Sequence, residues 1–280
     1  MRRVPRRAGA ARLARVLALA ALGAGCAAAM KEPPPVSALQ RPGADGGGAA
    51  SAGELLAAGR AAYGRRPDRG EVARALDLCL AAARADEAGA EGVQGLACAV
   101  QASAWLVEHE GAAASRAELA TRAVQSGQLC LRRAPESAAC RFWLAVALGL
   151  QARERPSTGS DALKHMVALL RRADQDDPGL DEAGPSRVLA TLLLRAPGWP
   201  VGPGDAEEGL VLARRAARLR PSHPPNQAVL AEALARCDEP EASREAAATA
   251  LALARGAAAA GNPDAADWIR QAEAAGARRP

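Results

Sequence analysis

An internal repeat limits what this chain of 280 residues can fold into more than any other feature. Three segments that would end a helix recur with their prolines 43 residues apart, in 132-RRAPES-137, 175-QDDPGL-180 and 218-RLRPSH-223. Each is followed by an apolar run that pairs Leu with Ala, in 144-LAVAL-148, 189-LATLL-193 and 230-LAEAL-234. A short helical unit cannot bury its apolar face alone, so the sequence predicts helical units that stack and share a core.

Beyond residue 51 the apolar residues recur with helical spacing, and no run alternates as a strand would. Hydrophobic residues make up 49% of the chain but aromatic residues only 2%, so the core must be built from Ala, Leu and Val. We therefore predict one all-α domain over residues 52–280, with about five helix pairs and a C-terminal capping helix. The predicted helices are 52–65 and 70–86, 92–109 and 115–133, 137–153 and 160–174, 183–195 and 205–219, 225–237 and 240–255, and 263–277.

The helix pairs have the features of a known repeat class. A small residue where two helices cross, with a proline that closes the second helix, resembles the tetratricopeptide repeat (TPR). The usual TPR period is about 34 residues, so the longer spacing here implies extended loops within the repeats. Functional residues concentrate on loops held by a rigid scaffold, which makes these loops the place to look for a site.

Residues 1–25 have the pattern of a bacterial signal peptide: an arginine-rich start, then the apolar run 16-VLALAALGAG-25, which is too short to anchor the chain across a bilayer. The next residue, Cys26, ends a segment that resembles a lipobox, in which the cysteine is lipidated, although Gly23 stands where Leu is usual. Simple secretion with cleavage near 27-AAA-29 is the alternative. In both cases we expect an exported protein. The lipoprotein interpretation places it in the periplasm, anchored to the outer membrane, with Pro/Gly/Ala-rich residues 26–51 as a flexible tether.

The basic charge of the chain does not indicate a nucleic-acid partner. Six arginines lie within residues 1–25, and without them the formal charge changes from +5 to −1. Acidic and basic residues are interleaved in the remainder, so there is no basic stripe to neutralise phosphates.

The cysteines are arranged about the predicted turns. Cys130 and Cys140 lie at equal distances from Pro135, and Cys79 and Cys98 lie at equal distances from the turn 86-DEAGAEG-92. Residues equidistant from the turn of an antiparallel helical hairpin face each other, so each pair could form a disulfide in an oxidising compartment. The alternative is that these four and Cys237 are all small buried core residues.

No arrangement of residues indicates catalysis, a cofactor or a metal site. The three histidines form no HExxH motif or triad, and no CxxC occurs. We therefore predict a protein that is not an enzyme. For Trp105, Phe142 and Trp143, core packing is the default interpretation, and lining of a groove is the alternative.

The loop in 194-LRAPGWPVGPGD-205 separates two predicted helices. Pro197 should end the first helix, and Asp205, with Glu208 three residues later, should cap the second. Trp199 has two interpretations: a plug that packs across the helix ends, or part of a surface for a ligand or partner. The candidate loop residues are Pro197, Gly198, Trp199, Pro200, Gly202, Gly204 and Asp205.

From Cys140 to about Trp268 the sequence resembles the T-component (TatT) family of tripartite ATP-independent periplasmic (TRAP) transporters, which are TPR-type lipoproteins. The resemblance is carried by 184-GPSRVLATLLLRAPGWPVGPGDAEEGLVLARRA-216, 221-PSHPPNQAVLAEAL-234 and 262-NPDAADWI-269. It implies a periplasmic helical protein that partners the solute-binding protein of a transporter and encloses a cleft for a small hydrophobic ligand. A generic TPR adaptor lipoprotein in envelope assembly is the alternative, and homo-oligomerisation stays open.

Overall fold

The structure is a computed structural model that describes residues 34–39, 50–156 and 159–277. All of them belong to one compact unit, Pro33–Pro280. The expected signal peptide and Cys26 lie outside the described residues, as does most of the expected tether.

The described residues form eleven α-helices and no β-strand, which confirms the all-α prediction. The helices are α2 (Ala52–Tyr63), α3 (Arg69–Ala85), α4 (Ala90–Glu108), α5 (Ala113–Arg133), α6 (Ala138–Glu154), α7 (Gly159–Asp176), α8 (Leu180–Arg195), α9 (Ala206–Leu219), α10 (Pro224–Arg236), α11 (Pro240–Ala259) and α12 (Ala265–Ala277).

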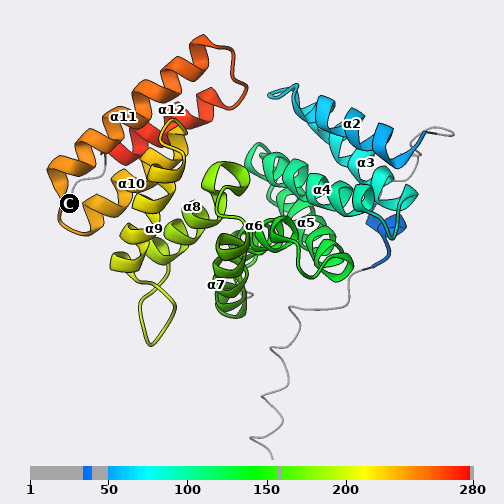
Figure 1. Cartoon of the computed structure of the whole chain (residues 1–280), viewed down its shortest axis with the longest axis horizontal. Helices are drawn as coiled ribbons and strands as arrows, with labels where there is room; N and C mark the ends of the chain where they lie inside the picture. The colour runs from blue at the N-terminus through cyan, green and yellow to red at the C-terminus, as the bar shows by residue number, and fades with distance from the viewer. Residues whose placement is uncertain (1–33, 40–49, 157–158, 278–280) are drawn as a thin grey trace, which may run out of the picture. The chain divides into compact units, whose positions relative to one another are not determined.

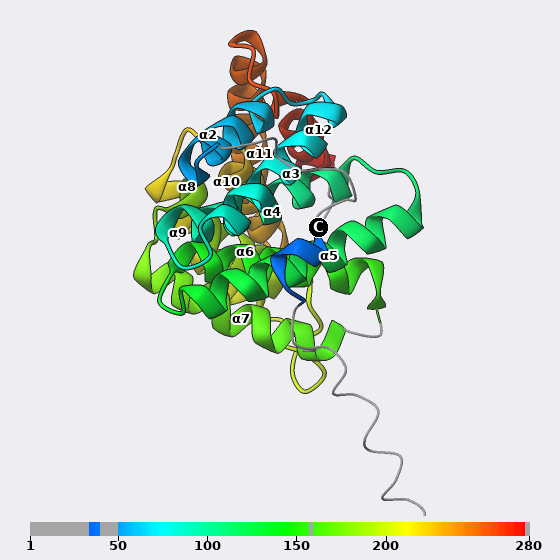
Figure 2. The ribbon, with the colours of Figure 1, turned by 90° about the vertical axis from the view of Figure 1, so that its right-hand side faces the viewer.

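The helices stack as antiparallel pairs along the chain (Figure 1). The pairs are α2/α3, α4/α5, α6/α7, α8/α9 and α10/α11, and α12 packs on α10 and α11. The first helices of successive pairs contact one another, so α2, α4, α6, α8 and α10 form an inner row. Figure 2 shows α2, α4, α6 and α7 one below another in this stack.

The core is made mainly of Ala and Leu, as the composition predicts. Small residues set the helix spacing. A Cβ atom on Gly95 would lie 2.6 Å from the carbonyl oxygen of Cys79, so α3 and α4 could not approach this closely with a larger residue there. Phe142 is the largest side chain that is almost fully buried, at 1% exposure.

One segment of the predicted tether belongs to the folded unit. Val36–Leu39 form a short 3-10 helix, η2, whose Val36 and Leu39 side chains are 3% exposed. This helix packs on α3 and α5, and Arg122 donates a hydrogen bond to the carbonyl oxygen of Leu39 at 2.5 Å. These four residues of the predicted tether therefore pack on the folded unit, and two apolar side chains are too few to show a helical period in the sequence.

The start of α8 departs from a regular helix. Asp181, Glu182 and Ala183 have φ angles of 48°, 56° and 63°, a left-handed conformation that costs roughly 1–2 kcal/mol for each L-residue. Arg187, which lies one turn further along α8, offsets this cost. Its guanidinium donates to the carbonyl oxygens of Asp181 and Glu182 at 3.2 and 3.0 Å, and to the Asp181 carboxylate at 2.9 Å.

Asn226 connects the same turn to two other helices. Its Oδ1 accepts a hydrogen bond from Arg187 at 3.1 Å, and its Nδ2 donates to the carbonyl oxygens of Glu182, Ala216 and Arg220 at 3.0, 3.2 and 3.2 Å. Asn226 is fully buried at the start of α10. The left-handed turn is thus held by a buried polar network that joins α8, α9 and α10.

Candidate functional site

The loop between α8 and α9 is a hydrogen-bonded turn that projects from the stack. The amide of Asp205 donates to the carbonyl oxygen of Leu193 at 3.0 Å, and that of Gly204 donates to Pro197 at 2.8 Å. Gly198 and Gly204 form a bridge across its base. A Cβ on Gly204 would lie 2.2 Å from the carbonyl oxygen of Ala196, so only glycine allows the two arms of the loop to meet this closely.

Asp205 caps α9, since its side chain accepts a hydrogen bond from the amide of Glu208 at 2.9 Å. The Glu208 side chain reaches Arg171 of α7, with two contacts of 2.9 Å. The loop is therefore held at both ends, by the helix cap and by the α8 backbone.

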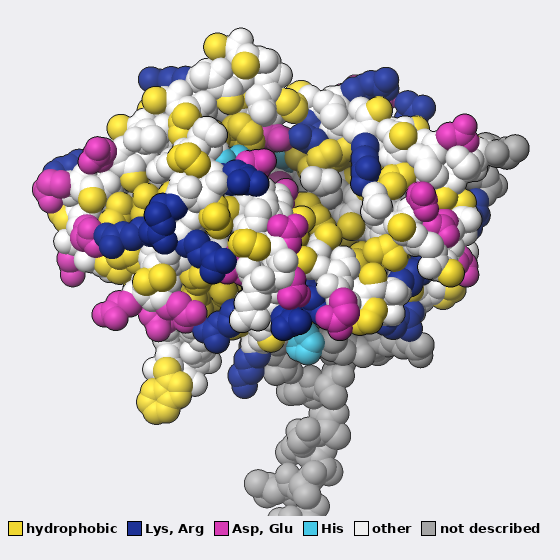
Figure 3. Space-filling model, viewed as in Figure 1, with side chains coloured by type: hydrophobic (Ala, Val, Ile, Leu, Met, Phe, Trp, Pro, Cys, Tyr) yellow, Lys and Arg dark blue, Asp and Glu magenta, His cyan; other side chains and the backbone are white. Residues whose placement is uncertain are grey.

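The tip of this loop presents apolar side chains to solvent. Trp199 is 90% exposed and Val201 is 77% exposed. Figure 3 shows hydrophobic side chains at the end of this projection, at the lower left of the view. A plug across the helix ends would be buried, so the plug interpretation of Trp199 is wrong. A free tryptophan on a held loop is instead available to a partner.

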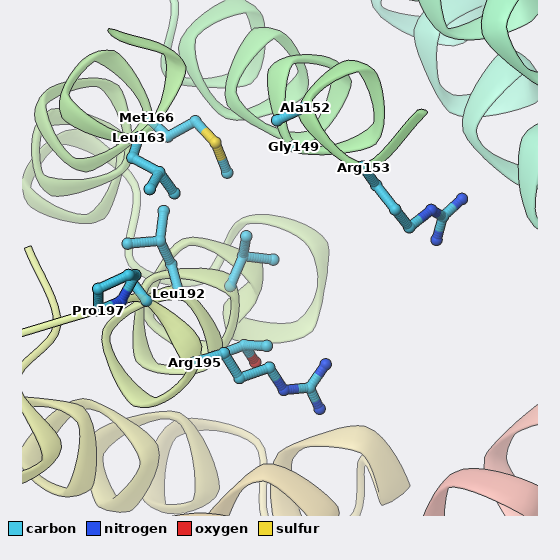
Figure 4. Close-up of a pocket in the computed structure, with 11 residues that line it drawn as sticks. Gly149, Ala152, Arg153, Leu163, Met166, Leu192, Arg195 and Pro197 are labelled. Atoms are coloured by element: carbon cyan, nitrogen blue, oxygen red, sulfur yellow. The ribbon is translucent and has the colours of Figure 1, made fainter. Parts of the chain in front are cut away.

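A pocket of about 450 Å³ lies between α6, α7 and α8, next to the base of the loop (Figure 4). Leu163, Met166, Leu192 and Pro197 gather at one end, and Arg153 and Arg195 lie at the other. Its other lining residues are Gly149, Ala152, Val188, Thr191 and Ala196. The lining is mostly aliphatic, which suits an apolar group.

The two arginines at this pocket have acidic partners. Arg195 forms two hydrogen bonds with Glu232 of α10, at 3.0 and 2.7 Å. Arg153 pairs with Glu108 at 2.7 Å and with Glu154 at 3.1 Å. The pocket therefore presents little uncompensated positive charge to a ligand.

The aromatic residues considered as groove lining occupy different positions. Trp105 is 8% exposed and Phe142 is 1% exposed, so both are core residues and not groove residues. Trp143 is half-buried and meets the Phe142 ring edge to face, with centroids 4.9 Å apart. None of the three lines the pocket between α6, α7 and α8.

The four paired cysteines lie in disulfides that join successive helix pairs. Cys79 of α3 is bonded to Cys98 of α4, and Cys130 of α5 is bonded to Cys140 of α6. Their Cα atoms lie 5.8 and 5.3 Å apart, within the usual range for a disulfide. Cys237 is bonded to none of the other cysteines that the structure describes.

His223, at the start of α10, has a strongly perturbed pKa. Its ring meets that of Trp268 edge to face at 5.3 Å. Burial lowers the pKa of His223 from 6.5 to about 4, the positive charge of Arg187 adds to this effect, and Asp264 opposes it. The imidazole is therefore neutral at pH 7.

This perturbed pKa makes stability depend on pH. In the unfolded chain His223 binds a proton near its ordinary pKa of 6.5, whereas the folded state binds one only near pH 4. Stability must then fall as the pH decreases from about 6.5 to about 4. Over this pH range, we expect the free energy of unfolding of the His223→Gln variant to fall by about 2 kcal/mol less than that of the original protein. This figure allows for the partial exposure of the ring.

Urea unfolding at pH 7 and pH 4.5 measures this difference. The exposed His165→Gln variant on α7 is the matched control and should follow the original protein. Equal acid sensitivity of all three proteins would show that His223 does not contribute.

No group of three or more His, Cys, Asp or Glu side chains in the described ranges is placed to hold a metal ion. Of the helices described, none combines the length and the apolar character needed to cross a bilayer.

Stacked antiparallel helix pairs with an inner row of first helices define this chain as a TPR-like helical-repeat protein. Among solved structures, the crystal structure of a thermophilic TPR protein from Thermus thermophilus is similar, with a TM-score of 0.57 and 17% sequence identity. The similarity covers 80% of this chain and 98% of that chain, and at this identity it shows the fold alone. Models of known protein families and curated protein sequences give no match.

Proposed function

We propose that the protein is a non-enzymatic adaptor of the cell envelope that binds a partner protein through the α8–α9 loop. The observation that carries this proposal is Trp199, 90% exposed at the tip of a loop whose base is fixed by hydrogen bonds. Tryptophan is enriched among the residues that dominate the energy of protein interfaces. Because the loop is ordered before binding, little conformational entropy is lost when the side chain is buried.

The partner class that we propose is a periplasmic solute-binding protein, as in the T-component family of TRAP transporters. The sequence resemblance is centred on this loop and supports the proposal. The pocket between α6, α7 and α8 supports a small hydrophobic ligand as a further element of this function, because its lining is aliphatic. A generic TPR adaptor in envelope assembly is the alternative.

The location that we propose is the periplasmic face of the outer membrane. It rests on the signal-peptide pattern of residues 1–25 and on Cys26 as the lipidated residue. Radiolabelled palmitate incorporated into the original protein but not into a Cys26→Ser variant would support the lipid anchor, and equal labelling would exclude Cys26 as its site.

A binding experiment tests the role of the loop. The solute-binding proteins of the same genome are purified, and their binding to the original protein, to Trp199→Ala and to Val211→Ala is measured by interferometry. Val211 is the matched control because it is apolar and 64% exposed on α9, outside the loop. We expect Trp199→Ala to weaken binding at least 30-fold, about 2 kcal/mol, and Val211→Ala to change it less than twofold.

Each result decides between the hypotheses. Both variants should keep the melting temperature of the original protein, since neither side chain is buried. Binding of no solute-binding protein would reject the T-component assignment. Equal affinity of Trp199→Ala and the original protein for a confirmed partner would reject the loop as the docking element.

A further inference from the structure

An ion pair and a histidine–carboxylate contact join the beginning of the helical stack to its end. Arg66, in the turn between α2 and α3, pairs with Asp264, in the turn between α11 and α12. His109, at the end of α4, pairs with Asp267 of α12 at 3.1 Å. The partners are 198 and 158 residues apart in the sequence. Figure 1 shows the α2–α3 turn facing the α11–α12 turn, and Figure 3 shows charged and histidine side chains at the hollow between them.

The Arg66–Asp264 pair has the geometry of a strong interaction. Nε and Nη2 of Arg66 donate to the two carboxylate oxygens of Asp264, both at 2.8 Å. The side chains are only 10% and 26% exposed, so solvent screens the pair less than a surface pair. Arg66 is also held by its own hairpin, because Nη1 donates to the carbonyl oxygen of Tyr63 at 2.7 Å and the guanidinium lies 3.8 Å from the Tyr63 ring centre.

The His109 ring is likewise held in place. It stacks on Trp105 with centroids 3.8 Å apart, and Nδ1 lies 2.8 Å from the Trp105 carbonyl oxygen. A carbonyl oxygen can only accept a hydrogen bond, so Nδ1 carries a proton, and a hydrogen bond from Nε2 to Asp267 forms when the ring carries a second proton. Nε2 faces the Asp267 carboxylate, which also accepts a hydrogen bond from Arg270 of the same helix.

Stacking of repeats does not require these contacts. In a helical-repeat protein each unit contacts its neighbours, and here α12 packs along α10 and α11 but not, among the helices described, along α2 or α4. The ends of the stack are therefore joined by side chains of two turns and two helix ends. An interaction of this kind can break while every helix pair stays folded.

We propose that Arg66, His109, Asp264 and Asp267 form a latch that holds the two ends of the stack together. Opening of the latch separates the α2–α3 turn from α12. Asp264 is close enough to His223, which lies against Trp268 at the start of α10, for its charge to act on the imidazole, so opening also removes Arg66 from the Asp264 side of His223. This proposal concerns the chain alone and does not depend on the identity of a partner.

Charge substitutions in the full mature chain test the latch. Arg66→Asp and Asp264→Arg each place like charges opposite each other, and the double exchange Arg66→Asp/Asp264→Arg restores opposite charges. Arg65→Asp is the matched control, because Arg65 lies in the same turn but pairs with Glu71 of its own hairpin at 2.6 Å.

The readout is the rate at which diethyl pyrocarbonate modifies His223, followed by mass spectrometry at pH 7. The reagent attacks neutral imidazole, and His165 on the exposed face of α7 is the internal reference. We expect each single exchange to raise the rate at His223 at least fivefold relative to His165, and the double exchange to return it to within twofold of the original. Small-angle scattering should show a larger maximum dimension for the single exchanges, with unchanged helix content by circular dichroism.

Two outcomes would overturn the latch. The first is a His223 rate for Arg66→Asp equal to that of Arg65→Asp. The second is a His223 modification rate in the double exchange that equals the rate in the single exchanges. This would mean that the charges at positions 66 and 264 do not act on each other. If one single exchange loses helix content, the other single exchange and the double exchange are judged by the same two outcomes.

Discussion

Replacing Arg187 with methionine should lower the free energy of unfolding by about 3–5 kcal/mol, because it leaves a buried charge network without its cation. Arg187 is the donor to two carbonyl oxygens of the left-handed turn and to the Asp181 carboxylate. Burial raises the pKa of Asp181, and Arg187 counteracts this shift, so the loss of the guanidinium favours protonation of Asp181 and removes the bonds that hold the turn.

Urea unfolding followed by circular dichroism measures this effect. Arg218→Met is the control, since Arg218 is exposed near the end of α9, and it should change stability by less than about 0.5 kcal/mol. Adding Asp181→Asn to Arg187→Met should recover part of the loss, because it removes the uncompensated carboxylate. A loss below about 1 kcal/mol for Arg187→Met would contradict the role given to the network.

Truncating Phe142 to alanine should destabilise the protein by about 3–5 kcal/mol, the usual cost of removing a large aromatic side chain from a core. Phe142 is 1% exposed and packs against the backbone of α8, where a Cβ on Gly184 would lie 2.7 Å from the ring Cζ. The ring therefore fills the space between α6 and the start of α8, and nothing nearby can replace its volume without moving a helix.

Thermal and urea unfolding of Phe142→Ala and Phe142→Leu separate loss of volume from loss of the ring. We expect the leucine variant to lose about 1–2 kcal/mol, since most of the volume is kept. Trp143→Leu should have a smaller effect than Phe142→Ala because Trp143 is half-buried. If both substitutions at Phe142 cost less than about 1 kcal/mol, this packing would not be important for stability.

The helix pairs could be predicted because each one repeats a strong local pattern. Proline and polar residues mark the ends, and Leu and Ala recur at helical spacing between them, so most predicted boundaries agree with the structure within three residues or fewer. No local sequence pattern indicates the left-handed conformation of the first residues of α8. Their left-handed conformation depends on Arg187 and on Asn226, which lies 39 residues beyond Arg187 in the sequence.

The candidate site could be predicted only in part. Proline, glycine and tryptophan in one segment indicate an ordered loop, but the same residues suit a buried plug and an exposed tip. The exposure of Trp199 follows from the direction in which the loop leaves the stack, which no local pattern records. The pocket needs side chains from three helices, and the latch joins turns 198 residues apart, so neither has a local signal.

The two disulfides make the stack mechanically uneven. Each joins the second helix of one pair to the first helix of the next, so α3, α4, α5 and α6 form one covalently braced block. The junction between α7 and α8 has no such brace, and the pocket lies there. Once the latch between the ends of the stack is open, bending should therefore concentrate at the α7–α8 and α9–α10 junctions, which neither disulfide crosses, and the C-terminal helices should move against a stiffer N-terminal block. A reducing compartment would remove this division, and motion would then spread over every joint of the stack.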